Sequence, residues 1–287
     1  MNVAQPPLRI VRRAAATPSP DWPESMHPVL RRVYAARGVA GPGETGHRLA
    51  GLLAPAGLGN LAHAVDLLAT AIANDASIVI AGDYDCDGAT GCAVAVRGLR
   101  VLGARHVGYV VPDRAIHGYG LTPVLVDTLH PAPDLIITVD NGISSIAGVA
   151  SAKARGCSVI VTDHHLPGAM LPDADAIVNP NLPGDAFASK ALCGVGVMFY
   201  LLLALRARLG KREEVDLTPL LDLVALGTVA DLVPLDANNR ALVEGGLRRI
   251  RMGNACAGIA ALFEVSSRDS RSATAADLAY AIAPRIM

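Results

Sequence analysis

The sequence has few aromatic side chains and almost no net charge. Phe, Trp and Tyr make up 3% of its 287 residues, and 25 basic side chains stand against 26 acidic ones. This balance excludes the chain-wide basic surface of many duplex-DNA binders, although a local basic groove is compatible with it. Small aliphatic residues dominate the 52% that is hydrophobic. Such a composition favours helices packed on a sheet over an all-β fold.

Membrane-spanning and secretory segments are also missing. The longest apolar stretch begins at Val195 and is shorter than the ~20 residues that a membrane-spanning helix needs. The N-terminal segment contains arginines and no apolar core, so it does not resemble a secretory signal. We therefore expect no membrane association, and we interpret residues 1–26, which are rich in Pro and Ala, as a flexible leader.

The cysteines fit neither a zinc site nor a set of disulfide bonds. Their number is odd, and no two of them are spaced as in a Cys-x-x-Cys motif. We therefore expect reduced thiols and a cytoplasmic protein. The five are Cys86, Cys92, Cys157, Cys193 and Cys256.

Short apolar runs alternate with helical patterns along most of the chain. Continuous apolar runs are typical of strands covered on both faces, and their alternation with helices predicts a mostly parallel sheet. We expect an α/β fold with about five strands and helices on both faces, a helical N-terminal cap at 27–60 and only helices after residue 190. The predicted strands are 77–81, 107–112, 134–140, 158–163 and 176–180, and the predicted helices are 27–39, 61–76, 90–104, 122–130, 144–156, 192–210, 217–230, 238–251 and 274–283.

Acidic side chains and histidines follow three of these strands. They are Asp83, Asp85 and Asp87 after the first strand, Asp140 after the third, and Asp163, His164 and His165 after the fourth. The carboxyl ends of parallel strands form one edge of a sheet, where ligands bind, so the three groups should converge there. Carboxylates so close together repel one another unless a cation lies among them. Oxygen and imidazole ligands without thiolates suit Mn²⁺ or Mg²⁺, and two such ions that share a carboxylate make a hydrolytic centre.

Each of these residues, taken alone, has a simpler structural explanation. Asp followed by Gly is a common turn signal, and Asp is a frequent N-cap of a helix. Three polar groups after three strands, one of them with adjacent histidines, are much less readily explained in that way. The sequence therefore predicts a metal centre at this edge of the sheet.

The segments around these residues resemble those of the DHH phosphoesterase superfamily and, within it, the RecJ-type single-strand-specific exonucleases. The resemblance runs from about residue 27 to the end of the chain. The segments "GYGL" and "GTVADLVPL" resemble RecJ-type enzymes more than the superfamily's pyrophosphatases or its nanoRNA and cyclic-dinucleotide phosphodiesterases. The matching segments are "GDYDCDGAT" (82–90), "PDRAIHGYGL" (112–121), "VDNGI" (139–143), "TDHH" (162–165), "NPN" (179–181), "LCGVGV" (192–197), "LGTVADLVPL" (226–235) and "NNR" (238–240).

The resemblance implies a centre with two ions, Mn²⁺ or Mg²⁺, that share Asp140. It implies that Asp83 supports the cluster or orients the attacking water, and that His165 contacts the scissile phosphate. It also implies that Arg114 and His117 hold the nucleic-acid backbone. The implied ligands are Asp85 and Asp140 for one ion, and Asp87, Asp140, His164 and Asp231 for the other.

For the activity, the resemblance implies 5′→3′ hydrolysis of single-stranded DNA in repair and recombination, beside a helicase and a single-strand-binding protein. The chemistry would be in-line attack of an activated water on a phosphodiester. For three of these residues an ordinary structural role is the alternative to a functional one. Asp231 could be a helix cap or an ion-pair partner, and Arg114 and His117 could be ordinary surface side chains.

Two features depart from the family pattern. Many relatives carry a histidine where this chain has Ala81, so a water would have to replace one ligand of the first ion. RecJ-type enzymes also continue beyond the equivalent of residue 287, with a second α/β domain (DHHA1) and an OB-fold that grips single strands. We therefore expect 61–235 to be the DHH catalytic domain and 236–287 to be a helical section leading to the absent part, which a second chain could supply.

Three other interpretations stay open. The chain could be a DHH-family phosphodiesterase for short oligonucleotides, cyclic dinucleotides or pyrophosphate, which faster cleavage of di- or tetranucleotides would support. It could be a non-catalytic scaffold, which tight metal binding without hydrolysis would support. It could also be an inert fragment, with exposed apolar surface on its last helices and poor solubility. The intact aspartates and histidines favour a catalyst, because a scaffold has no need of a destabilising anionic cluster.

Overall fold

The computed structural model describes residues 9, 11, 12 and 14–286. Contacts within the chain divide it into two units, residues 1–47 and 48–287, which are described separately. The flexible leader predicted for residues 1–26 lies partly outside the described residues, so it stays a prediction.

The first unit is organised around helix α1 (Pro28–Ala36). The Nδ1 atom of His27 accepts the N–H of Val29 at 3.2 Å and so caps the start of this helix. The chain leaves the helix before Gly38, which adopts a φ of +72° that glycine tolerates better than other residues. The helix therefore lies inside the range predicted for it, 27–39.

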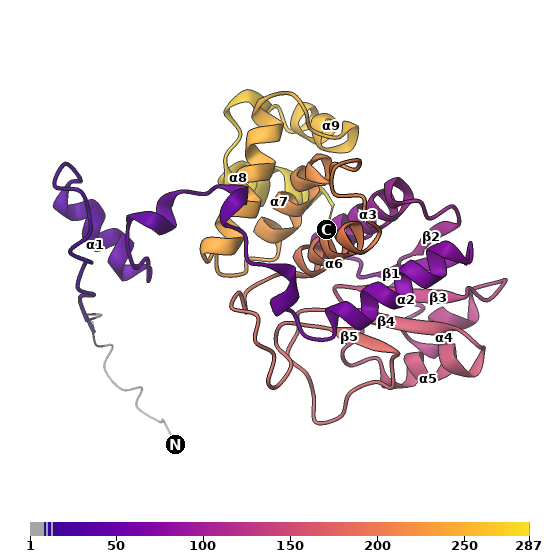
Figure 1. The fold of residues 1–287 in the computed structure, drawn as a ribbon. Coiled ribbons are helices and arrows are strands. Elements are labelled where there is room, and N and C mark those ends of the chain that lie inside the picture. The colour runs from indigo at the N-terminus through magenta and orange to yellow at the C-terminus, as the bar shows by residue number, and fades with distance from the viewer. Residues whose placement is uncertain (1–8, 10, 13, 287) are drawn as a thin grey trace, which may run out of the picture. The chain divides into compact units, whose positions relative to one another are not determined.

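A parallel sheet of five strands is the framework of the second unit (Figure 1). The strands are β1 (Ile78–Gly82), β2 (Val107–Val110), β3 (Leu135–Val139), β4 (Ser158–Thr162) and β5 (Ala176–Val178). Their order is β2-β1-β3-β4-β5, and every neighbouring pair is parallel. Ile78 pairs with Val107 on one side and with Leu135 on the other. This sheet confirms the predicted α/β fold.

Helices cover both faces of the sheet (Figure 1). The α-helices of this unit are α2 (Leu61–Ala73), α3 (Cys86–Leu102), α4 (Pro123–Asp127), α5 (Ile146–Ala154), α6 (Gly194–Arg208), α7 (Leu221–Ala230), α8 (Ala237–Arg251), α9 (Ala257–Val265) and α10 (Ala275–Asp277). Successive residues of a strand point to opposite faces, so Ile137 packs under α2, α3 and α6, whereas Ile136 packs under α4 and α5. Outside this layer, α7 packs against α3 and α6, and α8 packs against α7. The C-terminal helix predicted for 274–283 is the short α10 followed by a π-helical turn, η6 (Leu278–Ile282).

Two helices differ from the prediction for a physical reason. Helix α3 begins at Cys86 rather than Thr90, because the side chain of Asp85 accepts the N–H of Gly88 and caps it there. Helix α9 was not predicted at all. Its N-cap residue, Cys256, donates its N–H at 2.5 Å to the buried carboxylate of Asp222 in α7, a tertiary contact that no local pattern displays.

Among the described residues, no single helix is long and apolar enough to cross a membrane. One bent pair, 49–57 with 61–73, meets the criterion by length and composition only, and its two parts are bent by 89°. The second helix of that pair, α2, buries Leu61, Val65 and Leu68 in the core of the unit.

Candidate metal centre

The predicted polar groups meet at the carboxyl edge of the sheet. Asp83 follows β1, and its Oδ1 accepts the N–H of Tyr84 at 2.7 Å. Asp85 is the N-cap of α3, so the structural explanation for this residue is correct. Its position still brings it close to Asp83 and to Asp140, which follows β3. A carboxylate can therefore cap a helix and face a cation at the same time.

Asp140 lies in a bend that turns the chain toward the centre. Its φ is +62°, a conformation that is unfavourable for a residue other than glycine. The side-chain amide of the next residue, Asn141, donates to the carbonyl oxygens of Ala81 and Val139 at 3.0 and 2.9 Å and holds the bend in place. Ala81, the residue that departs from the family pattern, packs in the apolar cluster beneath α4 and α5 and offers no ligand atom.

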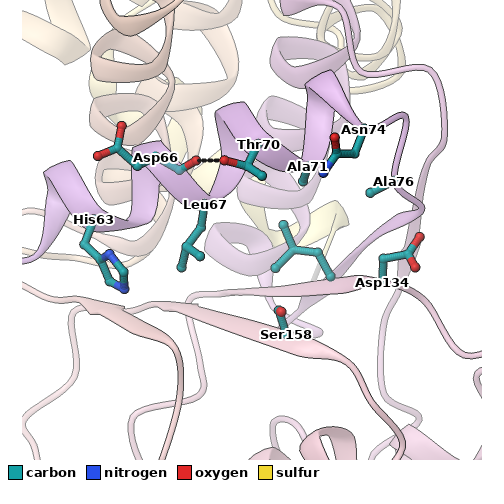
Figure 2. A pocket seen from close by; sticks show the side chains of 10 residues that line it. His63, Asp66, Leu67, Thr70, Ala71, Asn74, Ala76, Asp134 and Ser158 are labelled. Atoms are coloured by element: carbon teal, nitrogen blue, oxygen red, sulfur yellow. Dashed lines mark hydrogen bonds between the residues drawn. The ribbon is translucent and has the colours of Figure 1, made fainter.

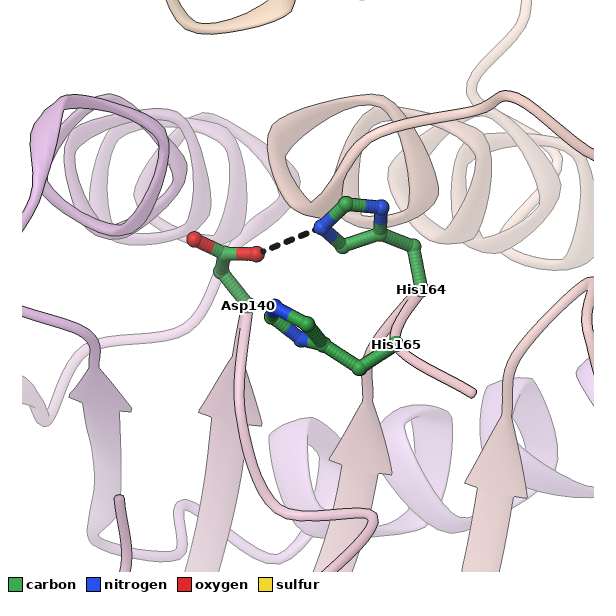
Figure 3. Close-up of side chains that lie close together, drawn as sticks. All are labelled: Asp140, His164 and His165. Carbon is green, nitrogen blue, oxygen red and sulfur yellow. Dashed lines mark ion pairs between the residues drawn. The ribbon is translucent and has the colours of Figure 1, made fainter. Parts of the chain in front are cut away.

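Three buried side-chain atoms point at one another without forming hydrogen bonds. Nε2 of His164 lies 3.1 Å from Oδ1 of Asp140 and 3.5 Å from Oδ2 of Asp231. None of the three atoms has a hydrogen-bond partner among the described residues. Figure 3 shows Asp140 and the adjacent histidines above the ends of the neighbouring strands. Buried polar atoms normally have partners, so this arrangement indicates that a further group belongs between them.

The spacing of these atoms fits a divalent cation. Adjacent ligands of an octahedral ion bound at about 2.1 Å lie about 3 Å apart, close to the separations observed. The side chains form three overlapping sets, and within each set the ligand atoms lie within 4.8 Å of one another. The sets are Asp83, Asp85 and Asp140; Asp87, His164 and Asp231; and Asp140, His164 and His165. The residues present therefore fit divalent cations, and Asp140 belongs to two of the three sets.

Asp87 is fixed from a distant part of the chain. Its two carboxylate oxygens accept the N–H groups of Gly194 and Val195, at 2.6 and 2.9 Å, from the first turn of α6. A helix N-terminus favours an anion in this position. Burial nevertheless raises the pKa of Asp87 to about 6, against the lowering effect of these hydrogen bonds.

Asp140 and Asp231 also resist ionisation in the absence of a cation. Burial, together with the charges of Asp87 and Asp85, raises the pKa of Asp140 well above its usual value. Burial and the charge of Asp87 raise the pKa of Asp231 to about 6. Burial lowers the pKa of His164, so its imidazole is neutral near pH 7 and can act as a ligand. A bound cation would reverse the repulsion among the carboxylates.

Asp163 and His165 form a second unit within the same loop. Oδ1 of Asp163 accepts the ring Nδ1–H of His165 at 2.7 Å, and Oδ2 accepts the N–H of Ile143 at 2.9 Å. Burial alone would raise the pKa of Asp163, but the hydrogen bonds and the charge of His165 lower it. The same hydrogen bond raises the pKa of His165. The pair therefore fixes the orientation of the His165 ring beside the cluster and favours its protonated form.

Arg114 and His117 lie on the loop between β2 and α4, which borders the cluster. The guanidinium of Arg114 lies over the ring of Tyr84, 5.6 Å from its centre, and Tyr84 connects Asp83 to Asp85. The Nδ1 atom of His117 accepts the N–H of Asp113 at 2.9 Å, which holds the loop together. The structure thus places Arg114 beside the centre and gives His117 a structural partner.

Sequence reasoning assigned no role to three groups that the geometry brings to the site. Asp163 was visible only as the first residue of the strand-end segment, and its hydrogen bond to a histidine two residues later is a matter of loop conformation. Tyr119 is close enough to hydrogen-bond to Asp83, and its ring meets that of His165 edge-on at 6.5 Å. Asn179 donates to the carbonyl oxygen of His165 at 2.9 Å. Its segment "NPN" was the only signal for this contact.

A pocket lies at the opposite, amino-terminal edge of the sheet (Figure 2). Helix α2 covers it, and its polar lining includes His63, Asp134 and Ser158. Oδ2 of Asp134 already accepts the N–H and the hydroxyl of Ser77, both at 2.7 Å. None of the predicted site residues lines this pocket, so it takes no part in the centre.

The chain matches a model of the DHH family, N-terminal domain, over residues 77–228. It is 52% identical over 283 residues to the single-stranded-DNA-specific exonuclease RecJ of Dickeya dadantii (strain 3937), covering 96% of this chain and 49% of that protein. Identity to the RecJ of Escherichia coli (strain K12) is 48% over 285 residues, with coverage of 96% and 49%. The chain thus spans about half the length of the curated relatives it matches.

Solved structures agree with this similarity. The crystal structure of RecJ from Thermus thermophilus in complex with Mn²⁺ superposes with a TM-score of 0.72 at 38% identity, over 88% of this chain and 35% of that one. The crystal structure of exonuclease RecJ bound to manganese gives a TM-score of 0.71 at 41% identity, over 79% and 56%. The matched region 77–228 holds the strands and most of the aspartates and histidines that form the cluster. The chain belongs to the DHH family.

Proposed function

We propose that this chain hydrolyses phosphodiester bonds of single-stranded DNA, from the 5′ end, with two Mn²⁺ or Mg²⁺ ions. The observation that carries the proposal is the convergence of three buried atoms without hydrogen-bond partners, on Asp140, His164 and Asp231. Nε2 of His164 lies 3.1 Å from Oδ1 of Asp140 and 3.5 Å from Oδ2 of Asp231. The similarity to RecJ proteins and to their manganese complexes supports the choice of ions and of substrate.

We assign the ligands as follows from the geometry. Asp87, His164 and Asp231 would hold one ion, Asp85 would hold the other, and Asp140 would be shared. When bound, the ions would activate a water and neutralise the charge that develops on the phosphoryl oxygens. We propose that residues 61–235 form the catalytic part, because every one of these ligands lies within them.

The remaining side chains would act on the substrate directly. His165, whose side chain is 46% exposed, would donate from Nε2 to an oxygen of the scissile phosphate, since Asp163 occupies its other nitrogen. Asp83, which Tyr119 supports, would orient the attacking water. Arg114 would approach the backbone phosphates from the bordering loop, and His117 would keep that loop in shape.

We also propose the setting that the similarity suggests. A RecJ-type activity would serve DNA repair and recombination in the cytoplasm, beside a helicase and a single-strand-binding protein. Names of the similar proteins support the single-stranded substrate, and the partners follow only from the family resemblance.

Release of mononucleotides from a 5′-labelled single strand tests the proposal. The strand is incubated with the chain and with Mn²⁺, Mg²⁺ or a chelator, and Asp140→Ala is assayed in parallel. We expect release that depends on the metal and that Asp140→Ala abolishes. Faster cleavage of dinucleotides than of long strands would instead favour a phosphodiesterase for short substrates. Tight Mn²⁺ binding without any hydrolysis would favour the scaffold interpretation.

A further inference from the structure

The two adjacent histidines are fixed by hydrogen bonds on both sides of their backbone. On one side, Oδ1 of Asp163 accepts the N–H groups of His164 and His165, at 2.7 and 3.1 Å. On the other side, the carbonyl oxygens of the same two residues accept the side-chain amides of Asn181 and Asn179, at 2.5 and 2.9 Å. Every backbone hydrogen-bonding group of the two histidines therefore has a side-chain partner.

The two rings need such a constraint, because successive side chains of an extended chain point to opposite sides. Here the ring centres lie only 4.5 Å apart, with the ring planes at 50° (Figure 3). Nε2 of His164 lies against the carboxylates of Asp140 and Asp231. The ring of His165 is bound instead to Asp163, through Nδ1. The backbone that joins the histidines therefore decides how the two rings lie relative to each other.

The ring of His164 lacks the usual means of orientation. A metal-binding histidine commonly donates its second ring nitrogen to an acceptor that fixes the ring. Within the described part of the chain, the hydrogen bonds of His164 are made by its N–H and its carbonyl oxygen, and none by Nδ1. The hold on its backbone is therefore what sets the placement of this ring.

The two asparagines are placed by a short turn that follows β5, with the sequence Asn-Pro-Asn at 179–181. Oδ1 of Asn179 accepts the N–H of Asn181 at 2.8 Å, which closes the turn around Pro180. Proline suits this position, since its ring restricts the backbone and it has no N–H to satisfy. Asn179 is completely buried, so its amide depends on a partner within the protein. The turn thus presents both amides to the backbone of the histidines.

A lysine holds the other side of this turn. Nζ of Lys190 donates to the carbonyl oxygen of Pro180 at 2.6 Å, and to the carbonyl oxygen and Oδ1 of Asp185 at 2.8 and 3.2 Å. Oδ2 of Asp185 in turn accepts the N–H of Gly59, just before α2, at 2.7 Å. A support that is itself held in place can fix the groups that it contacts.

We propose that Asn179 and Asn181 are positioning residues, which set the relative placement of the two histidine rings by holding their backbone. Asn181 acts through His164, and so on the ion that this ring would bind. Asn179 acts through His165, and so on the scissile phosphate. The inference rests on the proposed function for the roles of the two rings.

Mn²⁺ binding to Asn181→Ala tests the proposal, because this variant loses one hydrogen bond and keeps the backbone N–H that closes the turn. Titration calorimetry measures the affinity, and electron spin echo spectroscopy of bound Mn²⁺ detects a coupled histidine nitrogen. The same substitution is made in His164→Ala, which shows whether it acts through this ring. The matched control is Asn238→Ala in α8, whose side chain accepts from Leu53 and Tyr200.

We expect Asn181→Ala to weaken Mn²⁺ binding roughly tenfold and to reduce the nitrogen coupling. It should not change the affinity of His164→Ala any further. Asn238→Ala should lower the melting temperature and leave affinity and coupling unchanged. Asn179→Ala should lower the kcat of single-strand hydrolysis roughly tenfold, and should lower it no further when combined with His165→Ala.

An unchanged Mn²⁺ affinity in Asn181→Ala, or an equal loss when residue 164 is already alanine, would overturn the positioning role. So would the absence of nitrogen coupling in the unmodified chain. Hydrolysis that both asparagine substitutions leave intact would keep the proposed function standing and remove the positioning role. Loss of nitrogen coupling in Asn181→Ala, in a chain that hydrolyses no strand, would support the positioning role and contradict the proposed function. The two proposals can therefore fail separately.

Discussion

Both carboxylate oxygens of Asp87 accept backbone N–H groups from Gly194 and Val195, so one side chain of α3 closes the N-terminus of α6. The contact joins residues 107 positions apart and is almost completely buried. Asp87 thus holds two helices together, and under the proposed function it also faces a cation. Asp231, at the end of α7, has an oxygen with no hydrogen-bond partner among the described residues.

This difference predicts opposite effects of two matched substitutions on the metal-free chain. Asp87→Ala leaves two buried N–H groups without acceptors, and should lower the free energy of unfolding by about 2 kcal/mol. Asp231→Ala removes only a repelled charge near a helix C-terminus, and should raise that free energy by on the order of 1 kcal/mol or less, because solvent screens part of the repulsion. Urea unfolding with a chelator at pH 7.5 measures both. Losses of equal size would contradict the distinction.

Metal affinity should depend on pH in a direction set by the raised pKa values. Asp87 and Asp231 each have a pKa of about 6, above the usual carboxyl value, so the folded chain holds protons there that the unfolded chain has released. The metal-free chain therefore loses stability as the pH rises from about 4 to about 7. Binding of Mn²⁺ needs the ionised carboxylates, so its affinity should be roughly tenfold higher at pH 7.5 than at pH 5.5.

Titration calorimetry at the two pH values measures this affinity, and thermal unfolding with and without Mn²⁺ gives an independent reading. The increase in melting temperature on adding Mn²⁺ should be larger at pH 7.5. Asp66→Asn, a change at an exposed carboxylate paired with Arg208, is the control and should not alter the pH dependence. An affinity that is the same at both pH values would show that the cluster does not bind the ion.

The hydrogen bond from His165 to Asp163 predicts a loss of turnover without a loss of metal. Asp163→Asn weakens the hydrogen bond to the imidazole and removes the charge that raises its pKa. We expect kcat to fall roughly 100-fold, with Mn²⁺ affinity changed by less than about threefold. Combining it with His165→Ala should be no worse than His165→Ala alone, because the two side chains act as one unit. Additive losses in the double variant would show that the two side chains act independently.

Close approach at Gly194 predicts a further sensitive position. A Cβ atom there would lie 2.4 Å from Cβ of Asp140, so Gly194→Ala must displace either α6 or the shared carboxylate. We expect it to lower the free energy of unfolding by about 2 kcal/mol and to weaken Mn²⁺ binding. Gly258→Ala in α9 is the control, since its Cβ meets nothing within 4 Å. That change should be neutral or slightly stabilising, and similar losses in both variants would contradict the packing argument.

The sequence predicted the framework of the site because each strand, and so each strand end, can be recognised from a local pattern of residues. Continuous apolar runs located each strand, and the parallel arrangement then required Asp83, Asp140 and His164 to meet at one edge. Gly194 has no side chain, and this allows the start of α6 to lie close to Asp140.

The remaining features depend on tertiary contacts or on loop conformation. The partner of Asp87 lies on a helix far along the chain, and the bond between Asp163 and His165 requires a particular turn. Asp222 of α7 holds the N-cap residue of helix α9, Cys256, through a hydrogen bond that no local pattern reveals. The C-terminal turn η6 packs against α7, which lies far earlier in the chain. Such contacts follow from the fold and not from neighbouring letters of the sequence.

Electron paramagnetic resonance of the chain titrated with Mn²⁺ tests the central claim most directly. A carboxylate shared by two ions brings them close enough for their spins to couple. We predict two Mn²⁺ per chain with a coupled signal, loss of the coupling in Asp140→Ala, and a single uncoupled ion in Asp231→Ala. A single uncoupled ion in the unmodified chain, or a coupled pair that survives Asp140→Ala, would contradict the account of a two-ion centre bridged by Asp140.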